Sequence, residues 1–270
     1  MITIVGVGRI GSTVASNLIT RSLDDILLID IIEGLPQGEA LDLGHMAASY
    51  GVDVALRGTN DYEDIEGSDM VVVTAGLPRR PGMTRLDLLQ KNAQIVGDVS
   101  LKIAEYAPES KVLMVTNPLD VMTYVALKVT GFQAKRVLGM GGLLDSARFR
   151  YFISEALGVS RSSVQALVIG EHGESMLPLP KYSTVSGKPL TDLMSSEDIK
   201  AVVEKTRKTA AEVIALKGGT VHAPGSVVGE MVEAIVKDKK EVMPLSAYLD
   251  GEYGVKDLCI GVPAVLGREG

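Results

Sequence analysis

The first half of the chain alternates short runs of β-branched and other apolar residues with longer amphipathic stretches. The apolar runs predict strands over residues 2–5, 26–30, 52–56, 70–74, 111–116 and 136–138. Helical spacing of apolar positions predicts helices over 11–21 and 86–106. Because the strand runs lack polar alternation, we expect a doubly wound parallel sheet with helices on both faces.

The second half has a different pattern. It predicts a helix over 144–157, an extended apolar run over 164–169, long helices near 196–216 and 224–237, and strands around 242–249 and 257–262. We place a domain boundary at Gly141-Gly142, which gives an α/β domain over 1–141 and an α+β domain over 142–270. An active site is expected in the cleft between them.

A glycine-rich segment follows the first predicted strand and opens the first predicted helix. It reads Gly6-Val7-Gly8-Arg9-Ile10-Gly11 and fits the G-x-G-x-x-G pattern. Gly6 permits a tight turn, Gly8 lets the backbone approach a pyrophosphate, and Gly11 permits close packing of helix and strand. The alternative is a glycine-rich turn without a ligand, but the strand-turn-helix context favours a Rossmann-type dinucleotide site.

Asp30 ends the next predicted strand and indicates which dinucleotide binds. It lies 19 residues after Gly11, close to the spacing of about 20 residues expected for the acid that binds a ribose 2′-hydroxyl. A carboxylate repels the additional phosphate of NADP, and the following Ile31-Ile32 supplies no cation to hold it. The sequence therefore predicts NAD as the cofactor.

Composition excludes several other classes of protein. The net charge of −7 argues against a nucleic-acid partner. The apolar runs are shorter than the roughly 20 residues that a membrane helix needs, so no membrane association is expected. Cys259 is the only cysteine, which excludes an internal disulfide and a cysteine-built metal site and agrees with a cytoplasmic location. We expect no metal.

The three histidines occur in different contexts. His45 lies in an apolar helical stretch, where packing or a subunit contact is the better interpretation, and His222 begins a predicted helix. His172 follows the apolar run over 164–169 and is flanked by Gly170 and Gly173. That places it at a strand end, where α/β proteins carry their chemistry, so His172 is the candidate catalytic residue.

Several motifs together resemble the lactate/malate dehydrogenase superfamily. They occur in the same order and cover nearly the whole chain. Beyond the glycine segment and Asp30, these are Pro81-Gly82-Met83-Thr84-Arg85-Leu86-Asp87-Leu88-Leu89, Val115-Thr116-Asn117-Pro118-Leu119-Asp120, Leu144-Asp145-Ser146-Ala147-Arg148 and Ile169-Gly170-Glu171-His172-Gly173.

The resemblance implies an NAD-dependent oxidation of a 2-hydroxy acid, with His172 as the acid/base. It assigns Asp145 to the other ring nitrogen and Arg148 to the C1 carboxylate of the substrate. The alternative for Asp145 and Arg148 is an ion pair along an exposed helix. Asn117 is implied to bind substrate or cofactor, with a plain turn residue as its alternative.

A loop bounded by glycines and prolines, over residues 76–85, is interpreted as a lid. The resemblance implies that Arg85 polarises the reacting carbonyl and that Arg79 selects the substrate side chain. A cation at Arg79 favours a dicarboxylate, hence malate and oxaloacetate over lactate; lactate oxidation is the alternative. Thr220 is implied to line the substrate site. The other positions that the resemblance assigns to the cofactor are Arg9, Ile10, Thr74, Ala75, Gly76, Asn92 and Asn117.

Assembly is expected from the same sources. The apolar helical stretch over 38–48 suggests burial against a partner subunit, and the resemblance implies a homodimer or homotetramer. Members of the superfamily continue beyond the strand resembling residues 261–267 into a hairpin and a long helix. A catalytically weak NAD-binding protein with an assembly or regulatory role is therefore the second alternative.

Overall fold

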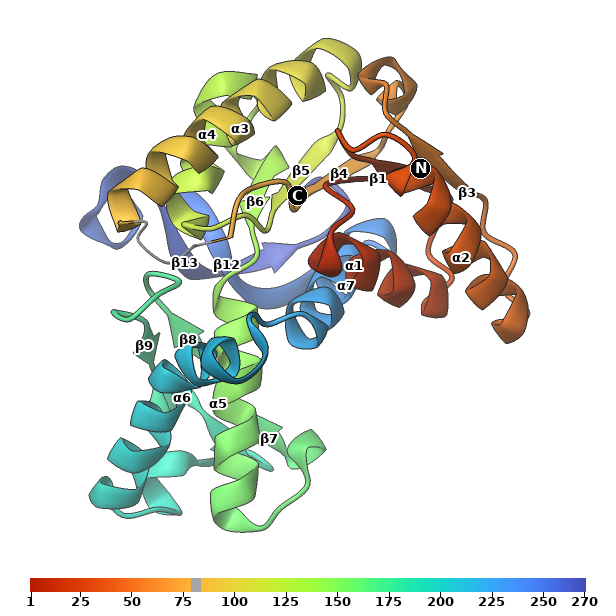
Figure 1. Cartoon of the computed structure of the whole chain (residues 1–270). Helices are drawn as coiled ribbons and strands as arrows, with labels where there is room; N and C mark the ends of the chain where they lie inside the picture. The colour runs from red at the N-terminus through yellow and green to blue at the C-terminus, as the bar shows by residue number, and fades with distance from the viewer. Residues whose placement is uncertain (79–83) are drawn as a thin grey trace.

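The computed structural model describes residues 1–78 and 84–270 and is built around an eight-stranded sheet. Its strands are β1 (Ile2–Val5), β2 (Ile26–Ile29), β3 (Leu56–Thr59), β4 (Met70–Val73), β5 (Lys111–Met114), β6 (Val137–Gly139), β12 (Glu241–Asp250) and β13 (Lys256–Leu266). They lie in the order β3-β2-β1-β4-β5-β6-β12-β13 (Figure 1). The first six are parallel, and the β12–β13 hairpin joins β6 antiparallel.

Helices cover both faces of this sheet. They are α1 (Arg9–Thr20), α2 (Leu35–Tyr50), α3 (Arg85–Tyr106), α4 (Leu119–Thr130), α7 (His222–Val236) and the start of α5 (Gly142–Leu157). The remaining long helix, α6 (Ser196–Lys217), packs on α5 away from the sheet. Alternate residues of one strand serve the two faces: Ile4 belongs to the core shared with α1, α2 and α7, and Val5 to the core shared with α3 and α4. Figure 1 shows these two helical layers on opposite sides. The doubly wound sheet is confirmed.

A smaller lobe carries the rest of the second half. It contains α6, most of α5 and the short strands β7 (Val164–Gln165), β8 (Val168–Ile169), β9 (Leu177–Pro178), β10 (Thr184–Val185) and β11 (Lys188–Pro189). Its own core includes Phe149 and Ile153 of α5 and Val202 of α6. Figure 1 shows α5 running from the sheet down into this lobe, so one helix connects the two parts.

Two strand predictions are wrong in their bounds. The strand predicted over 52–56 begins only at Leu56, and its paired residues include Arg57 and Gly58, which no apolar pattern would reveal. Gly58 is needed because a Cβ there would overlap the carbonyl oxygen of Pro36 in α2. The run over 164–169 is two separate strands, because β7 pairs with β10 while β8 pairs with β9.

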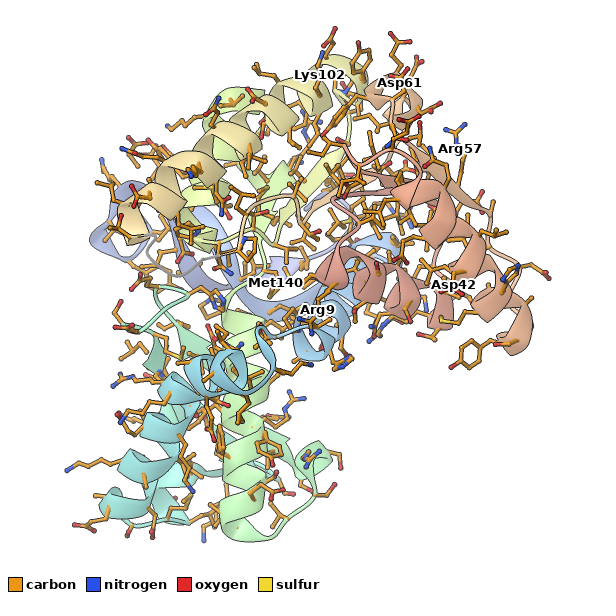
Figure 2. The ribbon with its side chains drawn as sticks, in the orientation of Figure 1. Arg9, Asp42, Arg57, Asp61, Lys102 and Met140 are labelled. Carbon is orange, nitrogen blue, oxygen red and sulfur yellow. The ribbon has the colours of Figure 1, made fainter. Side chains whose placement is uncertain are left out.

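The last two strands belong to the main sheet. Ser246 of β12 pairs with Gly139 of β6. Helix α7 packs against α1, and Arg21 of α1 donates a hydrogen bond to Glu233 of α7 at 2.8 Å. Charged side chains project from the outer surface of the first half, as Figure 2 shows for Arg57 and Lys102. Because β12 and β13 lie in the same sheet as the strands of the first half, the two halves share one sheet. The domain boundary at Gly141-Gly142 stays a prediction.

Candidate active site

The turn between β1 and α1 has room for a ligand at one glycine only. Gly6 has φ of +90°, and a Cβ there would lie 2.7 Å from the Ala75 nitrogen. A Cβ on Gly11 would overlap the Gly6 carbonyl oxygen, whereas a Cβ on Gly8 would meet nothing within 4 Å. Gly8 also caps the amino terminus of α1, where backbone N–H groups favour an anion. The turn thus fits a dinucleotide pyrophosphate.

Asp30 is fixed beside this turn by backbone hydrogen bonds. Its Oδ2 accepts the Val7 N–H at 2.7 Å, and its Oδ1 accepts the Ile32 N–H at 3.0 Å. Ile31 is 89% exposed and brings no cation. The carboxylate therefore lies where the glycine turn and the end of β2 meet, as an acid that binds a ribose requires. Arg9 and Ile10 form the first turn of α1, Arg9 exposed and Ile10 half-buried.

Side chains at the carboxyl ends of β4 and β5 hold the adjoining backbone. Thr74 Oγ1 donates to the Gly6 carbonyl oxygen at 2.7 Å, and Thr116 Oγ1 donates to the Ala75 carbonyl oxygen at 2.7 Å. Gly76 is required next to them, because a Cβ there would lie 2.5 Å from Thr116 Cγ2. The predicted cofactor positions Thr74, Ala75 and Gly76 thus adjoin the glycine turn.

Asn92 is buried, with 1% of it exposed. Its Oδ1 accepts the Leu77 N–H at 2.8 Å, and its Nδ2 donates to the carbonyl oxygens of Leu77 at 3.2 Å and Asn117 at 2.7 Å. The side chain therefore joins the start of the predicted lid to the backbone of Asn117. Asn117 itself is exposed, and its peptide bond to Pro118 is cis.

Two predicted catalytic residues, His172 and Asp145, meet the predicted substrate-binding residue Arg148 at the start of α5. His172 Nδ1 lies 2.7 Å from Asp145 Oδ2, and Arg148 Nη1 donates to Asp145 Oδ1 at 2.9 Å. Asp145 is 1% exposed, and the side chains of His172 and Arg148 are each 12% exposed. The Asp145–Arg148 ion pair of the alternative is therefore present, but it is largely buried and shared with His172 instead of lying along an exposed helix.

Sequence reasoning missed a second carboxylate at His172. Asp120, in the first turn of α4, accepts the backbone N–H of His172 on Oδ2 at 2.8 Å and the Ser246 hydroxyl on Oδ1 at 2.6 Å. Burial raises the pKa of the Asp120 carboxyl, and these two hydrogen bonds oppose that rise. Asp120 stands in the same motif as Asn117, which is the signal that the sequence contains. The motif does not reveal its partners, because they lie 52 and 126 residues further along the chain.

Other predicted positions are placed apart or not described. His45 on α2 and His222 at the start of α7 are exposed. Thr220 lies between α6 and α7, and within the described residues no hydrogen bond or ion pair joins it to His172. Arg79 lies outside the described residues. Arg85 is the first residue of α3, capped by Thr84, and its side chain is likewise not described.

The described part of the chain, residues 1–78 and 84–270, was compared with what a metal site and a membrane-spanning helix require. No group of three or more His, Cys, Asp or Glu side chains there could hold a metal ion. No helix in that part is both long and apolar enough to cross a membrane.

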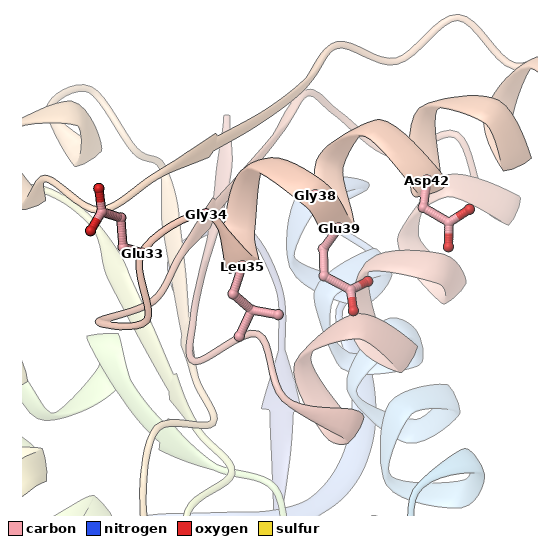
Figure 3. A pocket seen from close by; sticks show the side chains of 6 residues that line it. All are labelled: Glu33, Gly34, Leu35, Gly38, Glu39 and Asp42. Carbon is pink, nitrogen blue, oxygen red and sulfur yellow. The ribbon is translucent and has the colours of Figure 1, made fainter.

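A surface hollow of about 400 Å³ lies away from the candidate catalytic residues, along the start of α2 (Figure 3). Glu33, Glu39 and Asp42 line it. Three carboxylates repel an anion, so this hollow does not suit an anionic substrate.

A dinucleotide-binding sheet with a histidine–carboxylate pair and a buried arginine beside it defines a nicotinamide-dependent dehydrogenase. Residues 1–139 match the lactate/malate dehydrogenase NAD binding domain, and residues 143–270 match the alpha/beta C-terminal domain of the same family. The chain belongs to the lactate/malate dehydrogenase family.

Individual relatives carry both family names. The chain is 49% identical to a malate dehydrogenase of Methanosarcina barkeri over 100% of this chain and 88% of that protein. The structure of the Aeropyrum pernix malate dehydrogenase superposes with a TM-score of 0.97 at 50% identity, covering 100% and 88% of the two chains. A Cryptosporidium parvum lactate dehydrogenase, complexed with lactic acid and the dinucleotide, gives 0.95 at 42% identity, covering 100% and 87%.

Proposed function

We propose that this protein interconverts malate and oxaloacetate with NAD as the hydride carrier. The main observation that supports this proposal is the His172–Asp145 hydrogen bond beside Arg148. Because an ionised carboxylate can only accept a hydrogen bond, Nδ1 of His172 carries a hydrogen and donates it to Asp145, and Nε2 is the nitrogen that exchanges a proton with substrate. The bound nicotinamide supplies the hydride to the carbonyl carbon of oxaloacetate, or takes it back from malate.

The side chains of this chain then act on the carbonyl oxygen and the carboxylates. His172 donates the Nε2 proton to the oxygen during reduction, and Asp145 stabilises the imidazolium needed for that transfer. Arg148 binds the C1 carboxylate through its planar guanidinium and so orients the carbonyl. Thr220 lines the substrate site in this proposal.

The residues proposed to hold the cofactor divide by the part of the dinucleotide they face. Gly8 and the amino terminus of α1, with Arg9, Ile10 and the structural glycines Gly6 and Gly11, hold the pyrophosphate, and Asp30 holds a ribose. The group around Thr74, Ala75, Gly76, Asn92 and Asn117 holds the nicotinamide end. This division is supported by the open space at Gly8 and by the shared sheet edge.

Replacing His172 with Asn tests the proposal. A positioned acid/base contributes about 10²- to 10⁴-fold, so turnover of oxaloacetate with NADH should fall by at least the lower factor. NADH affinity, measured by fluorescence titration, should stay within about twofold, because the cofactor residues lie elsewhere. Wild-type protein that binds NADH but shows no turnover of oxaloacetate or pyruvate would favour the catalytically weak NAD-binding protein instead.

Arg79 is proposed to distinguish malate from lactate. The similarity to both malate and lactate dehydrogenases leaves the choice to local side chains. Removing one side of a desolvated charge pair costs ~2 to 5 kcal/mol, so kcat/KM for oxaloacetate should fall by about 30-fold or more in Arg79→Gln. Pyruvate should lose nothing, because its methyl group needs no cation.

Arg85→Gln is the matched control for Arg79→Gln. An arginine that polarises the carbonyl serves both substrates, so its loss should lower kcat for oxaloacetate and pyruvate alike. Steady-state kinetics with both 2-oxo acids measure the ratio. An unchanged substrate ratio in Arg79→Gln would remove Arg79 as the selector and reopen the choice between malate and lactate.

Assembly and location are also proposals. A homodimer or homotetramer is supported by α2, where Leu41 and Tyr50 are 64% and 63% exposed. A cytoplasmic location is supported by the single cysteine, Cys259.

A further inference from the structure

The loop that carries His172 is attached to β13 immediately before the histidine. Gly170 N–H donates to the Gly261 carbonyl oxygen at 2.8 Å, and Gly261 N–H donates back to the Gly170 carbonyl oxygen at 3.1 Å. A Cβ on Gly261 would lie 2.5 Å from that same oxygen, so the two backbones are in close contact. This fixes one end of the loop but not Glu171 and the backbone of His172 itself.

Asp120 provides the attachment at His172 itself. Its two carboxylate oxygens have separate partners: the backbone N–H of His172 and the hydroxyl of Ser246, which is fully buried in β12. The carboxylate therefore connects three segments that are distant in sequence, namely α4, β12 and the histidine loop. Gly141 also packs closely against His172, because a Cβ on Gly141 would lie 3.3 Å from the His172 Cβ.

We propose that Asp120, supported by Ser246, is a positioning residue for the reaction, which holds the main chain of His172 while Asp145 holds the ring. This inference rests on the proposed role of His172. Two separate anchors, one on the backbone nitrogen and one on Nδ1, restrict both the position and the rotation of the imidazole. Misplacing a reacting group by about 1 Å can cost on the order of 10²-fold in rate, so the backbone anchor contributes to kcat.

Two substitutions of Asp120 can separate its role in positioning His172 from any role of its negative charge. In Asp120→Asn the amide oxygen can still accept the His172 N–H, while the amide nitrogen donates to the Ser246 hydroxyl, which accepts as readily as it donates. Asp120→Ala removes both contacts. If the role is positioning, Asn should restore what Ala loses; if the negative charge is what matters, Asn should fail like Ala.

The kinetic test compares Asp120→Ala, Asp120→Asn and Ser246→Ala with wild type. We expect kcat for oxaloacetate to fall about 10- to 100-fold in Asp120→Ala, with KM and NADH affinity changed less than about threefold. Asp120→Asn should lie within about fivefold of wild type, and Ser246→Ala should show a smaller loss in kcat alone. Unchanged kcat in Asp120→Ala, or equal losses in Ala and Asn, would overturn the proposal.

Asp257→Asn serves as the matched control. Asp257 also joins α4 to the hairpin, through Lys128 Nζ at 2.8 Å and the hydroxyls of Tyr124 at 3.0 Å and Tyr248 at 3.1 Å, but it is exposed, and among the described residues no hydrogen bond or ion pair joins it to a candidate site residue. Its replacement should lower the melting temperature without changing kcat. A loss of kcat equal to that of Asp120→Ala would mean that docking of α4 on the hairpin matters, not the contact with His172, and would overturn the proposal.

Hydrogen exchange of the cofactor-free protein tests the same inference without turnover. Mass spectrometry of a peptide covering residues 170–176 should show faster exchange in Asp120→Ala than in wild type or Asp120→Asn, whereas a peptide from β2 should be unchanged. Equal exchange in all three proteins would overturn the positioning role. Wild type without turnover would contradict the proposed function, while the exchange result would still decide the role of Asp120.

Discussion

Gly6, Gly8 and Gly11 occupy one turn, yet their surroundings differ. Added Cβ atoms at Gly6 and Gly11 would collide with backbone, and only Gly8 opens onto free space. The φ and ψ of Gly8, −73° and −169°, are also accessible to any L-amino acid. The first and third glycines are therefore needed for folding, whereas the second is needed only for what approaches it.

Alanine substitutions should separate these requirements. Gly8→Ala should leave the melting temperature within about 1 °C of wild type but weaken NADH binding by about tenfold or more, since a methyl group would occupy the space of the pyrophosphate. Gly11→Ala should instead lower the melting temperature, because overpacking costs about 1–3 kcal/mol or more. Thermal melts and NADH fluorescence titrations measure both; normal NADH affinity in Gly8→Ala would move the pyrophosphate elsewhere.

The catalytic residues were predictable to different extents. His172 and Asp145 stand in motifs that their own neighbours define, and the structure joins them at 2.7 Å. Asp120 could not be predicted, because its importance depends on contacts with His172 and Ser246 that only the folded chain creates. Local sequence thus identifies the groups with the chemistry but not the group that holds their backbone.

Among the secondary structure elements, the buried strands were easiest to predict. β1 and β4 are fully buried and apolar except for Thr3, and their starting residues agree with the prediction. β3 was misplaced because it lies at the sheet edge and is defined by pairing with β2 and by contact with α2, not by apolar residues. The position of β12 beside β6 is likewise a property of pairing, which hydrophobic pattern alone does not determine.

Glu233 of α7 makes stability dependent on pH. A hydrogen bond from Lys237, with further support from Lys239, lowers the pKa of Glu233 from its ordinary 4.5 to about 2, although burial opposes the change. Arg21 of α1 pairs with the same carboxylate at 2.8 Å. Because the folded pKa is the lower one, Glu233 stabilises the fold fully above about pH 4.5, and this contribution is lost as the pH falls towards 2.

Glu233→Gln should therefore lower the melting temperature at pH 7, and its difference from wild type should shrink progressively between pH 4.5 and pH 2. Melting curves across this range provide the measurement. Glu204→Gln is the control, since Glu204 pairs only within α6, with Lys208 at 2.7 Å, and its side chain is 52% exposed. Its effect should be smaller at every pH. A constant difference between Glu233→Gln and wild type would contradict the assignment.

In the molecule as a whole, one sheet carries both kinds of site. Its central parallel strands end at the cofactor residues, and its antiparallel hairpin supplies Gly261 to the histidine loop and Ser246 to Asp120. Sequence predicted two halves with a cleft between them, which is the natural reading of two patterns along one chain. The shared sheet follows from the hydrogen bonds of β6, whose free edge accepts the hairpin.

The attachment of Gly170 to Gly261 also has a consequence for the order of events during synthesis. All the strands and helices that surround the glycine turn precede residue 140, except α7, so the dinucleotide-binding half can begin to fold while the rest of the chain is still being made. The histidine loop, although translated much earlier than β13, has no anchor at Gly170 until Gly261 has left the ribosome. A nascent chain can thus acquire its cofactor fold before its catalytic geometry, which has to wait until Gly261 has been translated.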